Sequence, residues 1–507
     1  MKNPLVFVDK FLNSVTMYAL LLIGLPLISL FAFVLSFFDL ISLQPLSLLI
    51  SLVTLVLVSM VSSTLFSKIW NVPSNKESAV ITAFILFLIV SPANTAFDLY
   101  VLLGIAVVAQ LSKYVLGFKG KHFFNPVAIS AVLLGLFGIG NVVWWVGSIY
   151  LLPVVAVVGF LIVRKIRRFN LFISFFTGSV LSLFLVQIAQ GSAPQFGEVL
   201  WQNIASWPLI FFGTIMLTEP ITMPPTKKKQ MVYGFIVGLM FSIPFHIGPL
   251  YGTPELALII GNIFSYCVSF KTRLRLVLKE KVEIAQGIFK FVFNTSPIPS
   301  FSAGQYFEIT LSDSKPDNRG NRRYFTIASS PTESEVAIGI KVIPQGSTFK
   351  QRLHALPLGG VVYAGQISGD FVLPRDEHKK LVFIAGGIGI TPFRSMVKYM
   401  LDTSSKHKSV LFYAVKDAKE LAYTDIFTEA VQKNMLTYVP VLNPKIEGWQ
   451  GESGYINKDM VVRHVGDFKD CLYYISGPSA MVDSYKKLLL SMGIAKKSIK
   501  TDYFPGL

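Results

Sequence analysis

Residues 323–329 read Arg-Tyr-Phe-Thr-Ile-Ala-Ser, a run with the residue pattern of a half-buried β-strand. On an extended strand every second side chain faces the same way, so Arg323, Phe325 and Ile327 share one face. A guanidinium suits a diphosphate, an aromatic ring suits another planar ring, and the hydroxyl of Thr326 suits a ring nitrogen. The run therefore predicts a strand that binds a phosphorylated aromatic cofactor, with an ordinary amphipathic strand as the alternative.

The surrounding sequence alternates in the same way over residues 272–282, 287–294, 304–311, 335–343 and 361–367. From residue 380 it changes to strand–helix units, over 380–385 with 392–402, 409–414 with 422–433, and 472–476 with 478–491. Antiparallel strands followed by parallel strand–helix units predict two domains. We expect an antiparallel β-barrel over residues 271–375 and an α/β domain over residues 376–507.

A glycine-rich loop at residues 386–392 (GGIGITP) follows the expected strand 380–385 and opens a helix. Glycines let the backbone approach a dinucleotide, and a helix N-terminus favours its phosphates. Glycines also serve plain tight turns, so the loop alone is a weak signal. Its place between a strand and a helix, downstream of residues 323–329, favours a dinucleotide site.

In this order the motifs resemble those of the ferredoxin–NADP reductase superfamily, whose flavin motif is Arg-x-Tyr-Ser/Thr. Phe325 stands where that family usually has Tyr. The resemblance implies hydride transfer from NADH or NADPH to FAD. The residues that it implies for FAD are Arg323, Phe325, Thr326, Ser329, Lys341, Gly346, Ser347 and Thr348. Those that it implies for the nicotinamide dinucleotide are Gly386, Gly387, Gly389, Thr391, Pro392, Gly477 and Pro478.

The resemblance also implies which residues lie near the reacting rings, namely Thr326, Thr391, Ser476 and Phe504. Ser476 replaces a Cys that lies close to the hydride path in relatives. A near-terminal aromatic residue covers the flavin ring in the family, and Phe504 is the candidate, with packing of a last strand as its alternative role. No arginine suited to a 2′-phosphate follows strand 409–414, which leans toward NADH over NADPH.

The first 270 residues have a different composition, with 14 Lys and Arg and 7 Asp and Glu, against 32 and 22 in the remaining 237. Ten apolar runs approach the length of about 20 residues that crosses a bilayer. They lie near 17–37, 45–66, 78–95, 99–116, 124–140, 143–163, 169–189, 204–218, 231–247 and 254–270. We therefore expect an all-α transmembrane electron-transfer domain over residues 1–270.

Basic residues occupy alternate loops between these runs, as they do on the cytoplasmic side of membranes. This pattern predicts a multi-pass protein of the cell membrane, with the N-terminus and the reductase domain in the cytoplasm. Basic residues in these loops, which would lie beside membrane lipid, account for part of the net charge of +17. The charge therefore does not indicate a nucleic-acid partner, and we expect none.

The inventory of metal-binding side chains excludes several chemistries. Cys267 and Cys471 are the two cysteines, too few for a plant-type iron–sulfur cluster or a four-cysteine zinc site. The membrane half has His122 and His246 at opposite span ends, so they cannot ligate one haem. We expect no metal site.

Prolines at span ends indicate an internal repeat. Pro92 and Pro126 recur as Pro220 and Pro254, each offset by 128 residues. Five spans in each unit make this an inverted five-helix repeat, an arrangement in which interrupted helices often mark a binding site. The alternative is chance recurrence in a chain with 27 prolines.

Residues 120–126 (GKHFFNP) and 213–222 (GTIMLTEPIT) resemble a family of membrane proteins that includes the B subunit of the sodium-translocating NADH:quinone reductase (Nqr) and the D subunit of the Rnf complex. Members of this family hold flavin within the membrane. The Ser-Gly-Ala-Thr segment that carries covalent FMN in the family has no counterpart here. We expect a non-covalent FMN or riboflavin near Asn125, Thr218 and Glu219, or simply helix caps at these positions.

Together these patterns predict a membrane NAD(P)H dehydrogenase, a flavoprotein oxidoreductase in which FAD receives hydride and the membrane domain carries electrons to an extracytoplasmic acceptor such as a flavinylated protein. One alternative is an NADH:quinone oxidoreductase, with or without ion pumping. Another is a redox-gated solute channel, because inverted five-helix repeats also build transporters.

Overall fold

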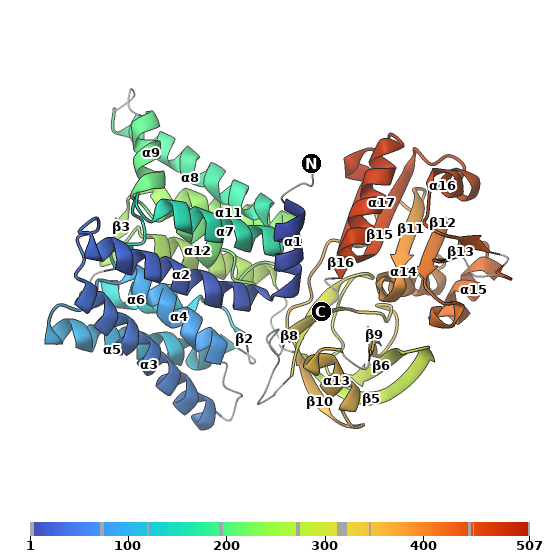
Figure 1. Cartoon of the computed structure of the whole chain (residues 1–507), viewed down its shortest axis with the longest axis horizontal. Helices are drawn as coiled ribbons and strands as arrows, with labels where there is room; N and C mark the ends of the chain where they lie inside the picture. Colours follow the sequence, from blue (N-terminus) through green and yellow to red (C-terminus); the bar gives the residue numbers. More distant parts are fainter. Residues whose placement is uncertain are drawn as a thin grey trace. The chain divides into compact units, whose positions relative to one another are not determined.

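The computed structural model describes residues 5–70, 76–118, 121–140, 142–191, 196–269, 274–311, 322–343, 346–444, 448–449 and 451–504. The chain forms two compact units, Met1–Thr272 and Arg273–Leu507 (Figure 1). The first unit is helical, and the second combines two six-stranded sheets with helices.

The helices of the first unit follow the order of the apolar runs. They are α1 (Leu5–Ser14), α2 (Met17–Phe37), α3 (Pro45–Ile69), α4 (Lys76–Ile89), α5 (Ala96–Val115), α6 (Pro126–Leu136), α7 (Leu152–Ile166), α8 (Phe169–Ala189), α9 (Phe196–Ala205), α10 (Leu209–Phe211) with the π-helical turn η1 (Phe212–Met216), α11 (Lys227–Ser242) and α12 (Pro254–Val268). Two short hairpins, β1–β2 (Gly117–Phe118, Lys121–His122) and β3–β4 (His246–Ile247, Leu250–Tyr251), lie between them.

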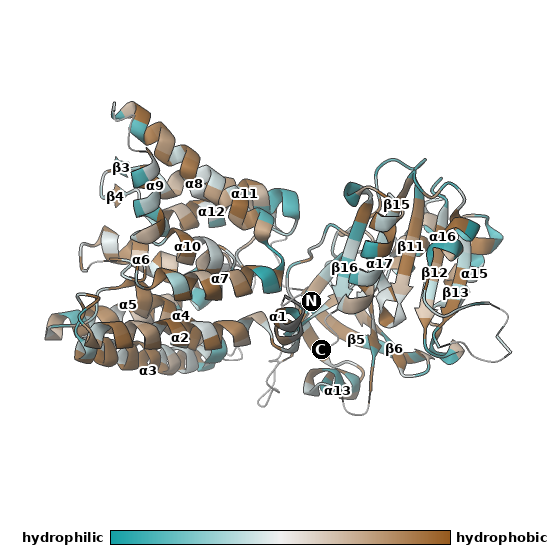
Figure 2. Ribbon diagram, turned by 45° about the horizontal axis from the view of Figure 1, so that its top comes forward, coloured by the Kyte–Doolittle hydropathy of each residue, from teal (hydrophilic) through white to brown (hydrophobic). Residues whose placement is uncertain are grey.

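Helix length divides this set. In the described part of the chain, α2, α3, α5 and α8 are long and apolar enough to cross a membrane, and α9 with α10–η1 forms a pair bent by 65°. The helices α4, α6, α7, α11 and α12 have 11 to 16 residues. Figure 2 shows hydrophobic residues along most of these helices. The unit therefore has the apolar helices of a membrane part, and ten crossings remain a prediction.

Three of the expected spans include backbone outside the helices, because α6 ends at Leu136, α7 begins at Leu152, and a bend of 65° separates α9 from α10–η1. Residues 142–147 instead extend along the end of α4. The N–H groups of Val143 and Trp144 both donate to the carbonyl of Ile89 at 2.9 Å. A helix end leaves its last carbonyls without partners, and this segment supplies the missing N–H donors.

The two halves of the first unit pack in the same order. In the first half α4 contacts α2 and α3, while α5 contacts α3 and α6. In the second half η1 contacts α7 and α8, while α11 contacts α8 and α12. Both α6 and α12 begin with proline, after the N-cap residues Asn125 and Thr253, whose side-chain oxygens accept backbone N–H groups. The recurring prolines therefore mark equivalent helix starts.

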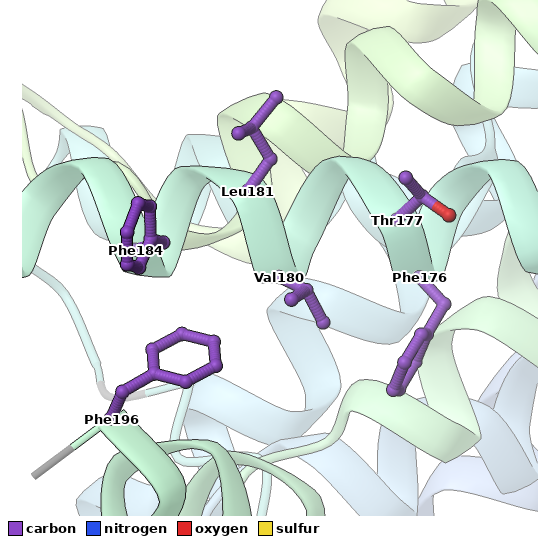
Figure 3. Close-up of a pocket in the computed structure, with 6 residues that line it drawn as sticks. All are labelled: Phe176, Thr177, Val180, Leu181, Phe184 and Phe196. Carbon is purple, nitrogen blue, oxygen red and sulfur yellow. The ribbon is translucent and has the colours of Figure 1, made fainter.

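The surface of the first unit has an apolar groove of about 350 Å³ along α8 (Figure 3). It is lined by Phe176, Thr177, Val180, Leu181, Phe184 and Phe196. The groove includes none of the side chains predicted from the sequence to bind a cofactor.

The second unit begins with an antiparallel sheet in the strand order β8-β7-β10-β5-β6-β9. Its elements are β5 (Leu274–Ala285), β6 (Ile288–Asn294), β7 (Tyr306–Thr310), β8 (Arg322–Thr326), β9 (Val336–Lys341), α13 (Thr348–Ala355) and β10 (Val361–Ala364). The N–H of Ala328 donates to the carbonyl of Ala337 at 2.7 Å, which links the two outer strands of the sheet. The six expected strands are confirmed to within a few residues.

A parallel sheet follows, in the order β14-β13-β12-β11-β15-β16. Its elements are β11 (Lys380–Gly386), η2 (Gly387–Ile390), α14 (Thr391–Asp402), β12 (Ser409–Val415), η3 (Ala418–Glu420), α15 (Thr424–Gln432), β13 (Leu436–Leu442), β14 (Glu452–Ser453), α16 (Lys458–Val465), β15 (Cys471–Pro478), α17 (Ser479–Ser491), η4 (Lys496–Ser498) and β16 (Ile499–Phe504). Leu381 and Phe383 pack under α14 and α15, while Val382 and Ile384 pack under α16 and α17. Helices therefore cover both faces of this sheet.

Candidate active site

The glycine-rich loop lies at the carboxyl end of the central strand β11. Register pairs Ala385 with Ser476, so residues 476–481 run beside the loop. Gly387 has a φ of +53° and open space where a side chain would stand. A Cβ on Gly389 would lie 2.4 Å from the carbonyl oxygen of Ser476. The first glycine leaves an open turn and the other permits the close approach of two chain segments, as a dinucleotide cradle requires.

Three predicted residues are buried where these segments meet. The hydroxyl of Thr391 donates to the carbonyl of Ile388 at 3.1 Å, and Pro392 occupies the first turn of α14. The Oγ of Ser476 is fully buried and has no hydrogen-bond partner among the described residues. A buried hydroxyl without a partner is uncommon in proteins, so this atom fits a site that a ligand completes.

The last strand runs beside the same segment. Parallel register places Tyr503 opposite Gly477 and Phe504 opposite Pro478. A Cβ on Gly477 would lie 2.5 Å from Cε of Met481. The backbone of Phe504 therefore lies beside the dinucleotide segment, while its side chain is outside the described residues.

The strand β8 carries the predicted flavin motif. Arg323 and Phe325 are buried and Tyr324 is 53% exposed, which agrees with the expected alternation. The ring of Phe325 stacks on that of Phe349 in α13 at 5.8 Å, and the Arg323 guanidinium lies 5.4 Å from the same Phe349 ring. Thr326 is also buried, at the end of β8. The structure thus brings Arg323 and Phe325 together around one helix.

That helix, α13, begins at the second predicted flavin segment. The side chain of Ser347 caps α13 and accepts the N–H of Lys350 at 3.4 Å, and Thr348 is the first helical residue. Gly346 precedes this cap in a turn closed by its N–H and the carbonyl of Ile343. A helix N-terminus offers unpaired N–H donors, so this segment fits a diphosphate.

Two predicted residues have structural partners in the described chain. The Nζ of Lys341 contacts Oε1 of Glu420 at 2.7 Å, joining β9 to η3 of the parallel-sheet region. The Oγ of Ser329 accepts the N–H of Ala337 at 2.9 Å. Ser329 therefore stabilises the junction of β8 and β9, and Lys341 forms an ion pair between the two sheets of the second unit.

The sequence analysis missed a second link between these sheets. Arg394 in α14 donates through both terminal nitrogens to the carboxylate of Glu333, and also to the carbonyl of Ala328 at 3.0 Å. Burial by itself raises the pKa of Glu333, but the hydrogen bonds and charge of Arg394 outweigh it, and the net pKa is lowered. No local pattern in the sequence signals this pair, because Glu333 precedes Arg394 by 61 residues.

Gly339 in β9 is another residue that the sequence analysis missed. A Cβ there would lie 2.6 Å from the hydroxyl of Tyr423 and 2.7 Å from Cγ2 of Thr391. Burial raises the pKa of Tyr423, whose hydroxyl has no hydrogen-bond partner in the described structure. The small residue lets the antiparallel sheet approach Thr391 directly, so the two predicted cofactor regions adjoin.

In the first unit the structure brings Asn125 and Glu219 together across 94 residues. The Nδ2 of Asn125 donates to Oε2 of Glu219 at 2.9 Å, and its N–H donates to Oδ1 of Asn262 at 2.8 Å. Thr218, in contrast, turns its hydroxyl to the helix carbonyl of Thr214 at 2.8 Å. Asn125 also caps α6, so a helix-capping role is shown for it and a ligand role stays a prediction.

These features define a class of protein. A dinucleotide loop on a parallel sheet, adjoining an antiparallel sheet with an Arg-x-Phe-Thr strand, is the arrangement of a flavin-dependent oxidoreductase module. The second unit is accordingly an FAD- and NAD(P)-binding, ferredoxin reductase-like module.

The comparisons with known proteins concern this same module. Residues 383–487 match the family model for the oxidoreductase NAD-binding domain. The chain is similar to the F subunit of the Na(+)-translocating NADH-quinone reductase of Methylococcus capsulatus, with 32% identity over 32% of this chain and 42% of that protein. It is also similar to the flavohemoprotein of Oceanobacillus iheyensis, with 26% identity over 45% of this chain and 57% of that protein.

The chain therefore spans about half the length of the curated relatives that it matches. Among solved structures, it is similar to the cytochrome b5 reductase domain of Ulva prolifera nitrate reductase, with a TM-score of 0.42 and 22% identity, over 46% of this chain and 97% of that one.

Proposed function

We propose that the chain is a membrane NAD(P)H dehydrogenase that passes electrons from the cytoplasm to an acceptor on the other side. The observation that carries this proposal is the junction of the glycine-rich loop with the antiparallel sheet at Gly339, in a chain that also has four long apolar helices. The junction supports hydride transfer between two adjoining cofactors. The apolar helices would let electrons pass from the reductase module into the membrane, a function that a soluble reductase would not need.

One group of residues in the second unit would bind the nicotinamide dinucleotide, and another would bind FAD. Gly386, Gly387 and Gly389 would hold the dinucleotide, while Thr391 and Ser476 would position its nicotinamide where the two sheets adjoin. Arg323, Ser347 and the N-terminus of α13 would hold the FAD diphosphate. FAD, when bound, accepts a hydride from the nicotinamide and releases electrons one at a time.

The membrane arrangement is part of the proposal. Ten crossings, with five in each inverted repeat, are supported by the matching packing order of α2–α6 and α7–α12. The short helices and the non-helical segment 142–147 fit a membrane protein, because irregular backbone within a bilayer must be hydrogen-bonded by protein. With basic loops inside, the N-terminus and the reductase module lie in the cytoplasm and the acceptor outside.

A second flavin in the first unit would shorten the electron path. The amide of Asn125 and carboxylate of Glu219 form a polar pair, and the aromatic rings of Phe123 and Tyr266 lie 4.8 Å apart on the neighbouring segments. Planar rings and hydrogen-bonding groups together suit a non-covalent FMN or riboflavin. The resemblance of residues 120–126 and 213–222 to flavin-holding membrane proteins also supports this site.

A second candidate function is NADH:quinone oxidoreduction, which the similarity to one component of a NADH-quinone reductase favours.

Purification in mild detergent followed by flavin extraction tests the two-flavin arrangement. We expect FAD and a second flavin in equal amounts. FAD alone, at one per chain, would contradict the membrane relay, and NADH oxidation that depends on added quinone would favour the second candidate.

A further inference from the structure

Buried hydroxyl groups follow one face of α3, although α3 is otherwise apolar. These are Ser47, Ser51, Ser59, Ser62, Ser63 and Ser67, each less than 9% exposed. Their spacing is close to the helical repeat, so they share the face that packs against α5. Small residues let membrane helices pack closely, and the hydroxyls of Ser51 and Ser67 donate to the carbonyls of Ser47 and Thr64 at 2.6 and 2.9 Å. The serine face alone therefore needs no further partner, and only the hydroxyls that remain unpaired in the described structure require one.

Hydrogen bonds join α3 to α5 at both ends. At the N-terminal ends, the hydroxyl of Ser47 donates to Oδ1 of Asn94 at 2.7 Å, and that of Ser51 accepts the N–H of Ala93 at 2.8 Å. At the C-terminal ends, the hydroxyl of Tyr114 donates to the carbonyl of Ser63 at 3.2 Å. The two helices therefore run parallel, and we call the space between them the α3–α5 seam.

The middle of the seam holds two buried polar side chains without partners. Ser59 is one turn before Ser63 and Gln110 is one turn before Tyr114, so they lie at the same level. Both residues are 0% exposed. Neither polar atom of the Gln110 amide, nor the Oγ of Ser59, has a hydrogen-bond partner in the described structure. Leaving such a buried polar group unpaired is unfavourable, which favours an occupant.

The second half of the first unit has the same feature between the equivalent helices. Ser179 in α8 and Ser242 in α11 each have a buried hydroxyl without a partner among the described residues. A Cβ on Gly238, one turn before Ser242, would lie 2.9 Å from the N–H nitrogen of Ser179, so these hydroxyls are close in level. The repeat offset of 128 residues maps Ser179 and Ser242 onto Ser51 and Tyr114, so each half has unpaired buried groups between the same pair of helices, but at different levels.

The polar groups of the α3–α5 seam favour water over a metal cation as its occupant. A primary amide needs both a donor and an acceptor, and a hydroxyl accepts either. A metal cation would satisfy the oxygens and leave the amide nitrogen unpaired, whereas water satisfies all of them. One turn beyond Gln110, the Nζ of Lys113 contacts the Oγ1 of Thr82 in α4 at 2.9 Å, so a charged group lies beside this end of the seam, between α5 and α4.

We propose that the α3–α5 seam binds ordered water at the level of Ser59 and Gln110, admitted from the end that carries Lys113. This goes beyond the proposed redox function and does not depend on it. Water at this depth would give protons access to the interior of the helical unit from one end.

Cysteine accessibility in the full chain, reconstituted in lipid nanodiscs, tests the proposal. Cys267 is exposed and is first replaced by serine, while Cys471 is buried and stays. Ser59→Cys is then compared with Leu55→Cys, a fully buried position one turn away on the same helix. The probe is a small cationic methanethiosulfonate reagent, and mass spectrometry follows its addition.

We expect Ser59→Cys to react at least about tenfold faster than Leu55→Cys, because a thiol in a dry apolar site stays protonated and inert. Adding Gln110→Leu should lower its rate to that of Leu55→Cys. Equal, slow rates at both positions would overturn the proposal. If Ser59→Cys does not fold, Gln110→Cys reports from the opposite wall, with the fully buried Ala106→Cys as its control.

Discussion

Replacing Gly389 by alanine is a severe test of the dinucleotide site. The new methyl carbon would stand 2.4 Å from the carbonyl oxygen of Ser476 and 2.6 Å from its carbonyl carbon. Ordinary contacts are 3.4 Å or longer, so one of the two segments must move by about 1 Å. A misplacement of about 1 Å costs roughly 100-fold in a reaction that depends on alignment.

We therefore expect kcat/KM for NADH in Gly389→Ala to fall about 100-fold, or by about 2.7 kcal/mol of transition-state stabilisation. The assay is NADH-dependent ferricyanide reduction by the full chain in detergent, with FAD content measured on the same sample. FAD should remain bound, because the atoms nearest to a Cβ on Gly389 belong to Ser476 and Gly477, which are not among the residues predicted to hold FAD.

Gly365→Ala is the matched control, since its Cβ would meet its nearest atom at an ordinary 3.6 Å. Its kcat/KM should stay within about twofold of the parent. Wild-type kcat/KM in Gly389→Ala, with normal FAD content, would show that this loop does not position the nicotinamide and would refute the reasoning.

Three other predictions concern packing, two in the second unit and one in the helical unit. The pKa of Glu333 is lowered in the folded chain, so its contribution to stability is complete above its unfolded pKa of about 4.3 and is lost as pH falls through the folded pKa. Glu333→Gln should therefore flatten the acid side of a plot of Tm against pH. An unchanged plot would contradict this. Lys341→Met and Glu420→Gln should each lower the free energy of unfolding slightly, with a coupling of about 1 kcal/mol in a double-mutant cycle measured by urea unfolding. Additive effects would argue against the ion pair. A selective loss of FAD in Lys341→Met would favour a diphosphate role for Lys341. Gly238→Leu would force a side chain where even a Cβ lies 2.1 Å from a carbonyl of α8, so we expect loss of folded protein by detergent size-exclusion chromatography; normal recovery would refute the close packing of α8 and α11.

The second unit was largely predictable because its signals are local. Periodicity located β8, β9 and β11, and the glycine-rich loop identified the dinucleotide segment without any knowledge of distant contacts. The strand β13 was missed because Pro440 lies within it, and proline normally argues against a strand in the interior of a sheet. Local pattern therefore predicts element type well, except where tertiary packing overrides a residue's preference.

Long-range pairing was beyond the reach of the sequence. Lys341 looks like a phosphate ligand from its motif, but its partner Glu420 is 79 residues away. The resemblance assigned Asn125 and Glu219 to one site, but their direct hydrogen bond, between the N-cap of α6 and the segment after η1, could not be read from the sequence. The sequence also predicted Thr218 as a flavin ligand beside them. Its hydroxyl instead donates to the carbonyl of Thr214 one turn earlier, a hydrogen bond within the helix that hydropathy does not predict.

The ten-span prediction illustrates a different limit. Apolar content reports where lipid or protein interior surrounds the chain, but it does not distinguish helix from non-helical backbone. Residues 143–151 are apolar enough to extend a span, yet Val143 and Trp144 hydrogen-bond to the end of α4 in a non-helical segment, in which Trp144 has a φ of +49°. The positions of the prolines were more informative, because Pro126 and Pro254 both open helices.

Electron transfer across a sealed membrane is the most direct test of the central proposal. Inside-out vesicles containing the full chain are loaded with a membrane-impermeant acceptor, and NADH is added outside, where the reductase module should face. The proposal predicts NADH-driven reduction of the trapped acceptor, abolished by Gly389→Ala and retained in Gly365→Ala. NADH oxidation without reduction of the trapped acceptor, in vesicles shown to be sealed, would contradict it.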